Sequence, residues 1–581
     1  MPPRSVSVAA SVLVAGLVYA CAWAVLPHDG LFINDNGCKL IQTEGLVRNG
    51  GADFSVPWPG RDVDPGLSFR PLGDPFGTVA RGKLFVSFPI PFALITSLPY
   101  RLFGTGGLTL LPFLSGLLLL PALAALAGLL GAGRRGTWCA VLGTALGTPV
   151  WFYAYTLWEH LPAVCLLTWG LVLLLRAQAG RGGGGVVALA ALLCGLAVWL
   201  RDDAVLFALA MAVIPLAARG PGPPLPRQRR DTILFVAVLL ATLVPLGIGQ
   251  WIVLGTPLGF HATTHGPFEH GAAGYVIERW TVFRDLVIDS HQTEWVSLLG
   301  GIPYVLLLLL HPALAPRRFA LAGELLLLWA VGWGAVAYAG HLSSRAPIWY
   351  LPSANGLFAV SPFLILACLR VSEPAEAVGR DGAAVDDRLR TALWLVVLID
   401  LGLYVLLAPP LHVAGIHWGS RLLMPLFPVL GVLAGATAGR LVRLRQGAAR
   451  ARAVALVVLA LVLSAAFQLH GLRLLDAEER FEARLVEEVM RRPEKTVIAT
   501  SWVVPQELAR CFYDKRIFLV RTPVDLQRLV PMLQGAGVGG GETRVLIIDA
   551  APSVAGAPAT DQLFSDGLDF MTYRLTEVDL R

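Results

Sequence analysis

Residues 83–104 read KLFVSFPIPFALITSLPYRLFG, and the placement of this segment decides the topology of every helix that follows it. The segment is apolar enough and long enough to cross a hydrocarbon core about 30 Å thick. It also contains Pro89, Pro91 and Pro99, and each proline interrupts helical hydrogen bonding. Whether this segment crosses a membrane or lies on its surface therefore has to be inferred from the rest of the sequence.

The composition is that of a polytopic α-helical membrane protein. Of the 581 residues, 55% are hydrophobic and 15% are charged, whereas charged residues make up about a quarter of soluble domains. Apolar segments of roughly 17–25 residues follow one another along the chain. The first of them, SVSVAASVLVAGLVYACAWAV (5–25), is long and is preceded only by Arg4, so we expect a retained helix rather than a cleaved signal peptide.

Arginine-rich loops indicate which ends of the helices are cytoplasmic. These loops contain Arg134 and Arg135, residues 176–181, residues 219–230, Arg317 and Arg318, residues 370–390, and residues 440–452. If all six are inside, about thirteen helices result, with the N-terminus inside and the C-terminus outside. The predicted spans are 7–26, 106–131, 137–155, 161–176, 185–200, 204–218, 232–253, 296–311, 320–340, 356–370, 392–408, 422–439 and 453–469.

This topology requires residues 83–104 to stay on one side of the membrane. If the segment crossed, all later helices would be reversed and the arginine loops would lie outside. We therefore predict broken, interfacial helix there, within a first outer loop over residues 27–105. The transmembrane domain is predicted over residues 1–470.

The C-terminal residues 471–581 differ in character. TVIATSW, RIFLVR and RVLIID are short strand-like segments, and PVDLQRLVPMLQGAG between the last two has a helical pattern. We predict a small extracytoplasmic α/β domain. The glycines of GVGGG (537–541) precede a strand rather than a helix, so they do not form a phosphate-binding motif.

Ionisable residues at membrane depth are costly and are functional candidates by default. The predicted topology brings four groups of them to the outer side, from separate parts of the chain. The groups are Asp35 with Glu44, Glu159 with His160, Arg201 with Asp202 and Asp203, and Arg421. We expect these groups to line one outward-facing cavity.

Each group also has a structural explanation. Asn34, Asp35 and Asn36 could cap the helix that follows them, and Arg201 and Asp202 could pair at a hairpin. Taken together, however, the acids could supply a general base and a second polar partner. The arginines could neutralise a phosphate leaving group, a combination that fits group transfer from a phosphate-linked donor.

The order of these motifs resembles the GT-C superfamily of membrane glycosyltransferases, in particular its protein O-mannosyltransferase and aminoarabinose-transferase branch. The motifs are INDNGCKLIQTEGLVRNG after the first helix, PYRLFG, TLWEH, GLAVWLRDDAVLF, GTPLGF and GSRLLMPLFP. Together they extend over nearly all of residues 1–470.

The resemblance implies a GT-C-like fold and inverting sugar transfer from a polyprenyl-phosphate donor to an acceptor hydroxyl on a glycan, lipid or protein. It implies that Asp35 is the general base and that Glu159 positions the acceptor or a divalent cation such as Mg²⁺ or Mn²⁺. Arg201 and Arg421 would face the polyprenyl phosphate. Asn36 stands where many relatives carry a second acid, and a single carboxylate holds a divalent cation poorly.

His160, Asp202 and Glu44 are expected to contribute to substrate binding, although His160 has no fixed counterpart in the family. The compositional bias toward Ala, Gly, Leu and Arg is typical of a GC-rich bacterium, so we expect an inner-membrane protein whose active site and C-terminal domain face the periplasm. The seven scattered cysteines predict neither a zinc site nor a disulfide framework. The basic residues lie in short loops, so no nucleic-acid partner is expected.

Other functions remain open on the sequence. A transporter or lipid flippase would use charges along a substrate path, but such proteins often have internal repeats, and none is evident. A non-catalytic subunit with the same fold and a polysaccharide ligase or polymerase are further alternatives. Loss of Asp35 would inactivate an enzyme and leave a binding subunit functional.

Overall fold

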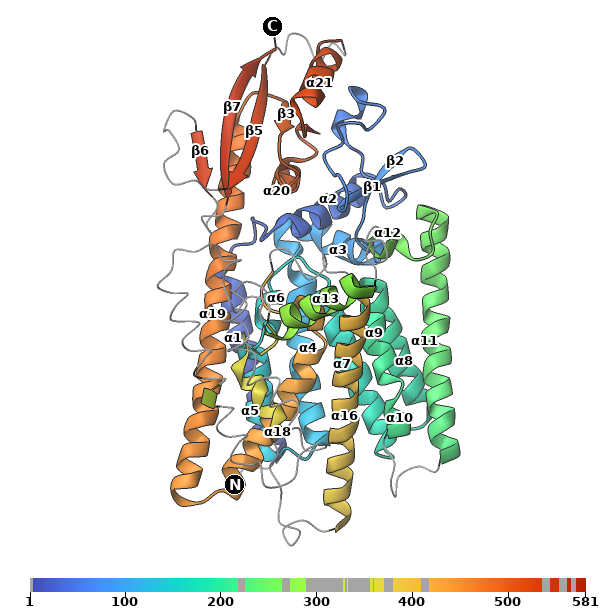
Figure 1. Ribbon diagram of the computed structural model, residues 1–581, viewed down its shortest axis with the longest axis vertical. Helices are drawn as coiled ribbons and strands as arrows, with labels where there is room; N and C mark the ends of the chain where they lie inside the picture. The colour runs from blue at the N-terminus through green and yellow to red at the C-terminus, as the bar shows by residue number, and fades with distance from the viewer. Residues whose placement is uncertain are drawn as a thin grey trace.

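The structure is a computed structural model of a mostly helical chain (Figure 1). It describes residues 4–217, 225–263, 272–288, 328–329, 332, 356–358, 360–369, 380–408, 417–535, 544–552, 562–565 and 571–580. The helices pack side by side in one bundle. A small β-sheet lies beyond one end of this bundle.

Seven helices of the described ranges are long and apolar enough to cross a membrane. They are α1 (Arg4–Val25), α4 (Leu110–Leu129), α7 (His160–Gln178), α11 (Leu225–Leu254), α16 (Arg380–Leu407), α18 (Leu426–Leu444) and α19 (Gly447–Arg491). Two shorter apolar stretches accompany them, α8 (Gly184–Leu200) and the pair α9 (Ala204–Met211) and α10 (Ile214–Ala217).

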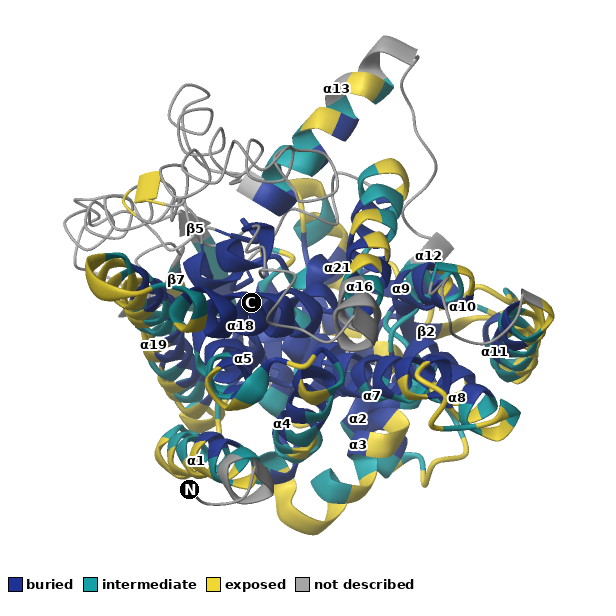
Figure 2. Ribbon diagram, turned by 90° about the horizontal axis from the view of Figure 1, so that it is seen from below, coloured by how far each residue is buried: buried dark blue, intermediate teal, exposed yellow. Residues whose placement is uncertain are grey.

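Large apolar side chains are exposed on the outer faces of this bundle. On α11, Ile233 and Trp251 are more than 60% exposed, and on α1 Leu17 is 56% exposed. Figure 2 shows buried residues in the centre of the bundle and exposed ones around its rim. Because water would disfavour so extensive an apolar surface, these faces indicate contact with lipid, and the chain is a multi-pass membrane protein.

The predicted count of about thirteen spanning helices is not confirmed. The predicted span 137–155 is divided into α5 (Gly133–Gly147) and α6 (Val150–Tyr153), on either side of Thr148 and Pro149. The predicted span 204–218 is likewise divided into α9 and α10, before Pro215. The predicted span 296–311 and nearly all of 320–340 lie outside the described residues, as do Arg317 and Arg318.

The predicted span 356–370 is wrong for the residues described there. They form a seven-residue 3₁₀ helix, Pro362–Cys368, which at about 2 Å per residue is too short to cross a membrane. Pro362 begins it, and all seven residues are buried. The amide of Phe363 donates to Ser464 Oγ on α19 at 2.9 Å. Burial in the protein explains why this segment is apolar without being a membrane span.

Residues 83–104 contain no spanning helix, as predicted. Their first residues form strand β2 (Lys83–Val86), which pairs antiparallel with β1 (Gly77–Ala80). The rest forms α3 (Ile90–Phe103), whose 14 residues are about 21 Å long and contain Pro99. Helix α3 packs against α2 (Asn34–Arg48) at the end of the bundle nearer the sheet (Figure 1). The loops α4–α5, α7–α8 and α18–α19 lie at the opposite end.

Helix α19 continues for 45 residues from the bundle to the C-terminal segment, so the boundary predicted at residue 470 falls inside one helix. The segment beyond it contains a five-stranded sheet in the order β4-β3-β5-β7-β6. Its elements are β3 (Thr496–Ala499), α20 (Val504–Glu507), β4 (Arg516–Leu519), α21 (Pro523–Gly535), β5 (Arg544–Pro552), β6 (Gln562–Ser565) and β7 (Met571–Asp579). Strands β3, β4 and β5 coincide with the three predicted strand segments and are parallel.

The short remaining elements complete the described chain. They are α12 (Gly259–Thr263), α13 (Ala272–Phe283), a π-helix at Arg284–Ile288, and 3₁₀ helices at Pro59–Asp62, Gly104–Gly107, Arg421–Leu423 and Ala509–Cys511. Helix α12 lies beside β1 and β2 at the sheet end of the bundle (Figure 1).

Helix α2 lies between the bundle and the C-terminal segment. On one face, a Cβ atom on Gly37 would lie 2.0 Å from the carbonyl oxygen of Gln506, and one on Gly45 would lie 2.6 Å from the hydroxyl of Tyr513. That hydroxyl donates to the carbonyl of Ile41 at 2.7 Å. Residues 37, 41 and 45 share a face because they are four apart. The glycines therefore allow the C-terminal segment to pack directly on the backbone of α2.

We predict that Gly37→Ala loosens this contact. The added methyl group cannot fit against the Gln506 carbonyl, and overpacking of this kind costs about 1–3 kcal/mol. The variant should show a lower melting temperature in detergent and faster proteolysis of the C-terminal segment. Gly128→Ala on α4, where nothing lies within 4 Å of the new Cβ, is the matched control and should leave both unchanged.

Candidate active site

The first turn of α2 is fixed by Asn36 rather than by a cap from Asp35. Asn36 Oδ1 accepts from the amide of Ile33 at 3.2 Å, and Asn36 Nδ2 donates to the carbonyl of Leu157 at 2.9 Å. The second bond ties α2 to the turn that precedes α7. Asp35 makes no capping bond at its own helix start. Helix capping therefore explains the presence of Asn36 but not that of Asp35. The Asp35 carboxylate is left for another role.

Asp35 pairs instead with Arg421, which begins the 3₁₀ helix before α18. The distance from Asp35 Oδ2 to Arg421 Nη1 is 2.9 Å, and both side chains are about one-sixth exposed. The Arg421 guanidinium also lies 5.8 Å from the ring centre of Trp158, consistent with a cation–π contact. Residues 386 positions apart thus form one ion pair that solvent can reach.

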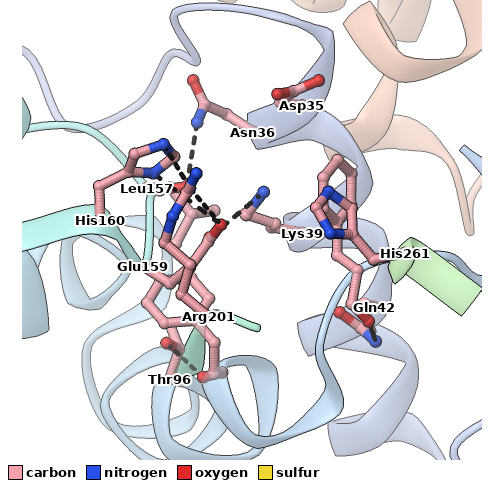
Figure 3. Close-up of polar contacts among 12 residues, drawn as sticks. Asp35, Asn36, Lys39, Gln42, Thr96, Leu157, Glu159, His160, Arg201 and His261 are labelled. Carbon is pink, nitrogen blue, oxygen red and sulfur yellow. Dashed lines mark hydrogen bonds and ion pairs between the residues drawn. The ribbon is translucent and has the colours of Figure 1, made fainter. Parts of the chain in front are cut away.

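Glu159 accepts two cationic partners from different helices. Lys39, one turn after Asp35 on α2, places Nζ 3.3 Å from Glu159 Oε2. Arg201, at the end of α8, places Nη1 3.6 Å from Glu159 Oε1. Figure 3 shows Lys39 and Arg201 pointing toward Glu159 from two sides. Lys39 and Glu159 are 1% and 5% exposed, so this is a buried pair, and removing either partner alone is strongly destabilising.

His160 extends this cluster. Its Nε2 contacts Arg201 Nη1, and because a guanidinium can only donate, Nε2 accepts and the imidazole proton lies on Nδ1. Nδ1 is 3.9 Å from Glu159 Oε1. The imidazole also stacks on the ring of Tyr153, with 5.2 Å between centroids. His160 therefore helps to hold Arg201 in place, while its Nδ1 is too far from Glu159 for a hydrogen bond.

The two aspartates after Arg201 have different partners. Asp203 pairs with Arg201 itself. Asp202 accepts from His261 Nδ1 on α12 at 2.9 Å. Burial would raise the pKa of the Asp202 carboxyl, but the charge and hydrogen bond of His261 and the charge of Arg201 hold it below its ordinary value. Burial would lower the pKa of His261, and Asp202 raises it above its ordinary value instead.

Glu44 is not brought to this site. It lies nine residues from Asp35, or about 13 Å along α2. Its carboxylate pairs with Arg48 at 2.7 Å and accepts from the Tyr100 hydroxyl on α3 at 3.1 Å. These contacts join α2 to α3. The substrate-binding role expected of Glu44 remains a prediction, without support from its position.

Sequence reasoning missed Lys39 and His261, and it did not find the bond that joins Asn36 to Leu157. The spacing of four between Asp35 and Lys39 was a usable signal, because it places both on one helix face at the membrane mouth. Asn36 was noted as a possible helix cap and as a departure from a pair of acids. His261 follows the GTPLGF motif, but nothing in the sequence pairs it with Asp202.

The carboxylates in this arrangement do not fit a divalent cation. Glu159 faces Lys39 and Arg201, and Asp35 faces Arg421, so neither has a free set of oxygen ligands. Within the described ranges, no group of three or more His, Cys, Asp or Glu side chains could hold a metal ion. The Mg²⁺ or Mn²⁺ suggested by the family resemblance therefore has no site among these residues.

We predict a pH-dependent effect of Asp202→Asn on stability. Because the folded-state pKa of His261 is raised, its pairing with Asp202 contributes fully below about pH 6.5 and is lost as the pH rises through that raised pKa. The loss of melting temperature should be larger at about pH 6 than at about pH 9.

Asp53→Asn is the control for this measurement. Asp53 pairs with Lys83 at 2.6 Å, and lysine stays protonated over the same pH range. The loss of melting temperature caused by Asp53→Asn should be equal at both pH values. An Asp202→Asn effect that is also equal at both would contradict the assigned His261 pairing.

Comparison with known proteins gives structural similarity only. No protein-family model matches the chain, and no curated protein matches it significantly. Among solved structures, it is similar to ArnT from Cupriavidus metallidurans bound to undecaprenyl phosphate, with 14% identity, 97% of each chain covered and a TM-score of 0.47. It is also similar to the oligosaccharyltransferase AglB from Archaeoglobus fulgidus in complex with an inhibitory peptide and a dolichol-phosphate.

The AglB match has 12% identity and a TM-score of 0.46, and covers 93% of this chain and 69% of AglB. ArnT and AglB are both GT-C superfamily glycosyltransferases. At these identities and TM-scores, residue roles cannot be transferred from them and have to follow from the geometry of this chain.

Proposed function

We propose that the chain transfers a sugar from a polyprenyl-phosphate donor to an acceptor hydroxyl, with inversion and with Asp35 as the general base. The observation that carries the proposal is the Asp35–Arg421 pair. It is a partly exposed carboxylate held by a guanidinium, at the end of a membrane bundle and one helical turn from the buried Lys39–Glu159–Arg201 cluster. A lipid-borne donor and a water-borne acceptor can meet only at such an end.

The positive charge gathered at this end of the bundle supports a phosphate-containing substrate. Three cations, Lys39, Arg201 and Arg421, come from three separate elements to this end of the bundle. Arginine presents a planar fork of donors that matches phosphate oxygens. Arg421 has its Nη1 on Asp35, and in the described part of the chain its other donors have no hydrogen-bond partner and could bind a phosphate. The cations are already fixed by carboxylates, so their donors are pre-organised for a leaving phosphate.

The reaction needs one base and no acid. The Asp35 carboxylate accepts the proton of the acceptor hydroxyl as the acceptor oxygen attacks the anomeric carbon. The bond from that carbon to the phosphate oxygen breaks, and both of its electrons leave with the polyprenyl phosphate. A single displacement inverts the anomeric configuration. Arg421 and Arg201 stabilise the charge on the departing phosphate, while Glu159 keeps Lys39 and Arg201 in place.

The reacting end is proposed to face the extracytoplasmic side. Arginines gather around the loops α4–α5, α7–α8 and α18–α19 and in the first turns of α11, and these parts lie at the end opposite α2 (Figure 1). An excess of arginine marks the cytoplasmic ends of membrane helices. We therefore place α2 and residues 471–581 outside, in the periplasm if the chain lies in a bacterial inner membrane. Clustering of the charges at one end supports an enzyme over a transporter, whose sites lie near the midplane.

We predict that Asp35→Asn abolishes transfer. The substitution keeps the shape of the side chain and removes the base, which should lower kcat by roughly 10²–10⁴-fold. The measurement is transfer of radiolabelled sugar from a panel of polyprenyl-phosphate donors by purified protein. Asp53→Asn, in the same outer region but paired with Lys83 away from the cluster, should retain full activity.

The outcomes separate the alternatives. Equal transfer by the wild type and by Asp35→Asn would remove Asp35 from the mechanism. Donor-phosphate binding by folded wild-type protein without transfer to any acceptor would argue for the non-catalytic or transport function instead.

A further inference from the structure

The sheet of the C-terminal segment has a strand order that marks one position as a candidate for ligand binding. From β3 the chain passes to β4 on one side, and β5 then lies on the other side of β3. All three strands are parallel, so their carboxyl ends lie at one edge. In open α/β sheets, ligands bind outside the carboxyl ends of the strands where the strand order reverses. Here that position lies outside the carboxyl ends of β3 and β5, and we call it the crevice.

An exposed tryptophan lies in this position. Trp502 follows β3 by three residues and is 48% exposed. One face of its indole stacks on Phe76, with the ring centroids 5.3 Å apart and 10° between the planes. Thr500, the residue after β3, donates to the carboxylate of Asp549, which lies within β5, so a hydroxyl and an acid join the two strands. A flat aromatic surface and hydrogen-bonding groups are therefore found together.

Trp502 is connected to the reacting cluster through aromatic rings. Phe76 lies 6.3 Å from Phe88, and Phe88 lies 5.8 Å from His261, measured between ring centres. The Lys39 ammonium lies 3.4 Å from the centre of the Phe88 ring. Lys39 in turn pairs with Glu159. We call Trp502, Phe76 and Phe88 the aromatic series. It extends from the crevice of the sheet to the buried ion pair.

The residues at this position do not form a phosphate-binding loop. The segment after β3, TSWVVPQ (500–506), contains no glycine for a phosphate loop, and α20 has only four residues. The carboxylate of Asp549 would repel a phosphate. Figure 1 shows β3 in the sheet that lies beyond the end of the bundle. The crevice suits a neutral ligand that has both an apolar face and hydroxyl groups.

We propose that Trp502, Phe76 and Asp549 form a saccharide-binding subsite. A pyranose ring presents a face of C–H groups, which pack on an indole, and equatorial hydroxyls, which can donate to the Asp549 carboxylate. The subsite binds a neutral carbohydrate, and the aromatic series joins it to the site where α2 holds Asp35. That this carbohydrate is the acceptor of the transfer rests on the proposed function. The acceptor class is therefore a glycan.

Saturation-transfer NMR tests the subsite without requiring any reaction. The probes are methyl α- and β-glycosides of hexoses and pentoses, added at millimolar concentration to purified protein in detergent. The wild type should saturate ring C–H protons of at least one glycoside, and Trp502→Ala should weaken its binding about tenfold. Trp502→Phe should retain part of the signal, since it keeps an aromatic face and the same packing on Phe76.

One variant serves as the control. Trp251→Ala removes an exposed indole from α11 and should not change the glycoside signal. Absence of binding by every glycoside, or a signal unchanged in Trp502→Ala, would overturn the subsite. Trp502-dependent binding of a peptide but of no glycoside would overturn it as well.

The transfer assay separates this inference from the proposed function. With a glycan acceptor, Trp502→Ala should raise the acceptor KM about tenfold while kcat and the donor KM stay unchanged. If no donor supports transfer but Trp502-dependent glycoside binding persists, the subsite stands and the proposed reaction fails. If transfer proceeds and neither the acceptor KM nor the glycoside signal depends on Trp502, the reaction stands and the subsite fails.

Discussion

The buried carboxylate of Glu159 is the interaction on which the arrangement of this site depends. It lies at the start of α7, where the N-terminal end of the helix dipole favours a negative charge. It accepts Lys39 from α2 and Arg201 from the end of α8, and the Lys39 ammonium has almost no exposed surface. Neither cation could remain at that depth without a carboxylate. Glu159 therefore determines where α2 meets the bundle.

Once α2 is held there, its remaining contacts follow from helical geometry. Lys39 and Asp35 are one turn apart, so the bond to Glu159 places Asp35 beside Arg421. Gly37, Ile41 and Gly45 lie on nearly the opposite face and contact the C-terminal segment. The same fifteen residues thus carry the proposed base, the ion pair that fixes it and the surface on which the sheet packs.

The grouping of the charged residues at one end of the bundle could be predicted from the sequence, because it depends on only a few properties that the sequence displays directly. Apolar length and arginine-rich loops were enough to bring Asp35, Glu159, Arg201 and Arg421 to one end. The same arginine-rich loops, together with the three prolines of residues 83–104, were enough to rule out a spanning helix there. The remaining features depend on tertiary packing. Nothing in residues 356–370 distinguishes a buried 3₁₀ segment from a membrane span, since both are apolar.

The site residues that were missed or wrongly grouped were hard to predict for similar physical reasons. A lysine in a polar helix is usually solvated, so Lys39 gave no sign that it would be buried against Glu159. Glu44 was grouped with Asp35 because it is near in sequence, although nine residues of helix separate the two by about 13 Å. The role of Asn36 as a tie to Leu157 depends on a contact 121 residues away.

The most direct test of this account is a double-mutant cycle on Lys39 and Glu159, measured as free energies of unfolding in mixed micelles. Glu159→Gln should cost about 3–5 kcal/mol, because it leaves Lys39 without a carboxylate. Lys39→Met should cost less, since Glu159 keeps Arg201. The double variant should be less destabilised than the sum of the two by roughly 1–3 kcal/mol. Additive effects would contradict the claim that this pair holds α2 on the bundle.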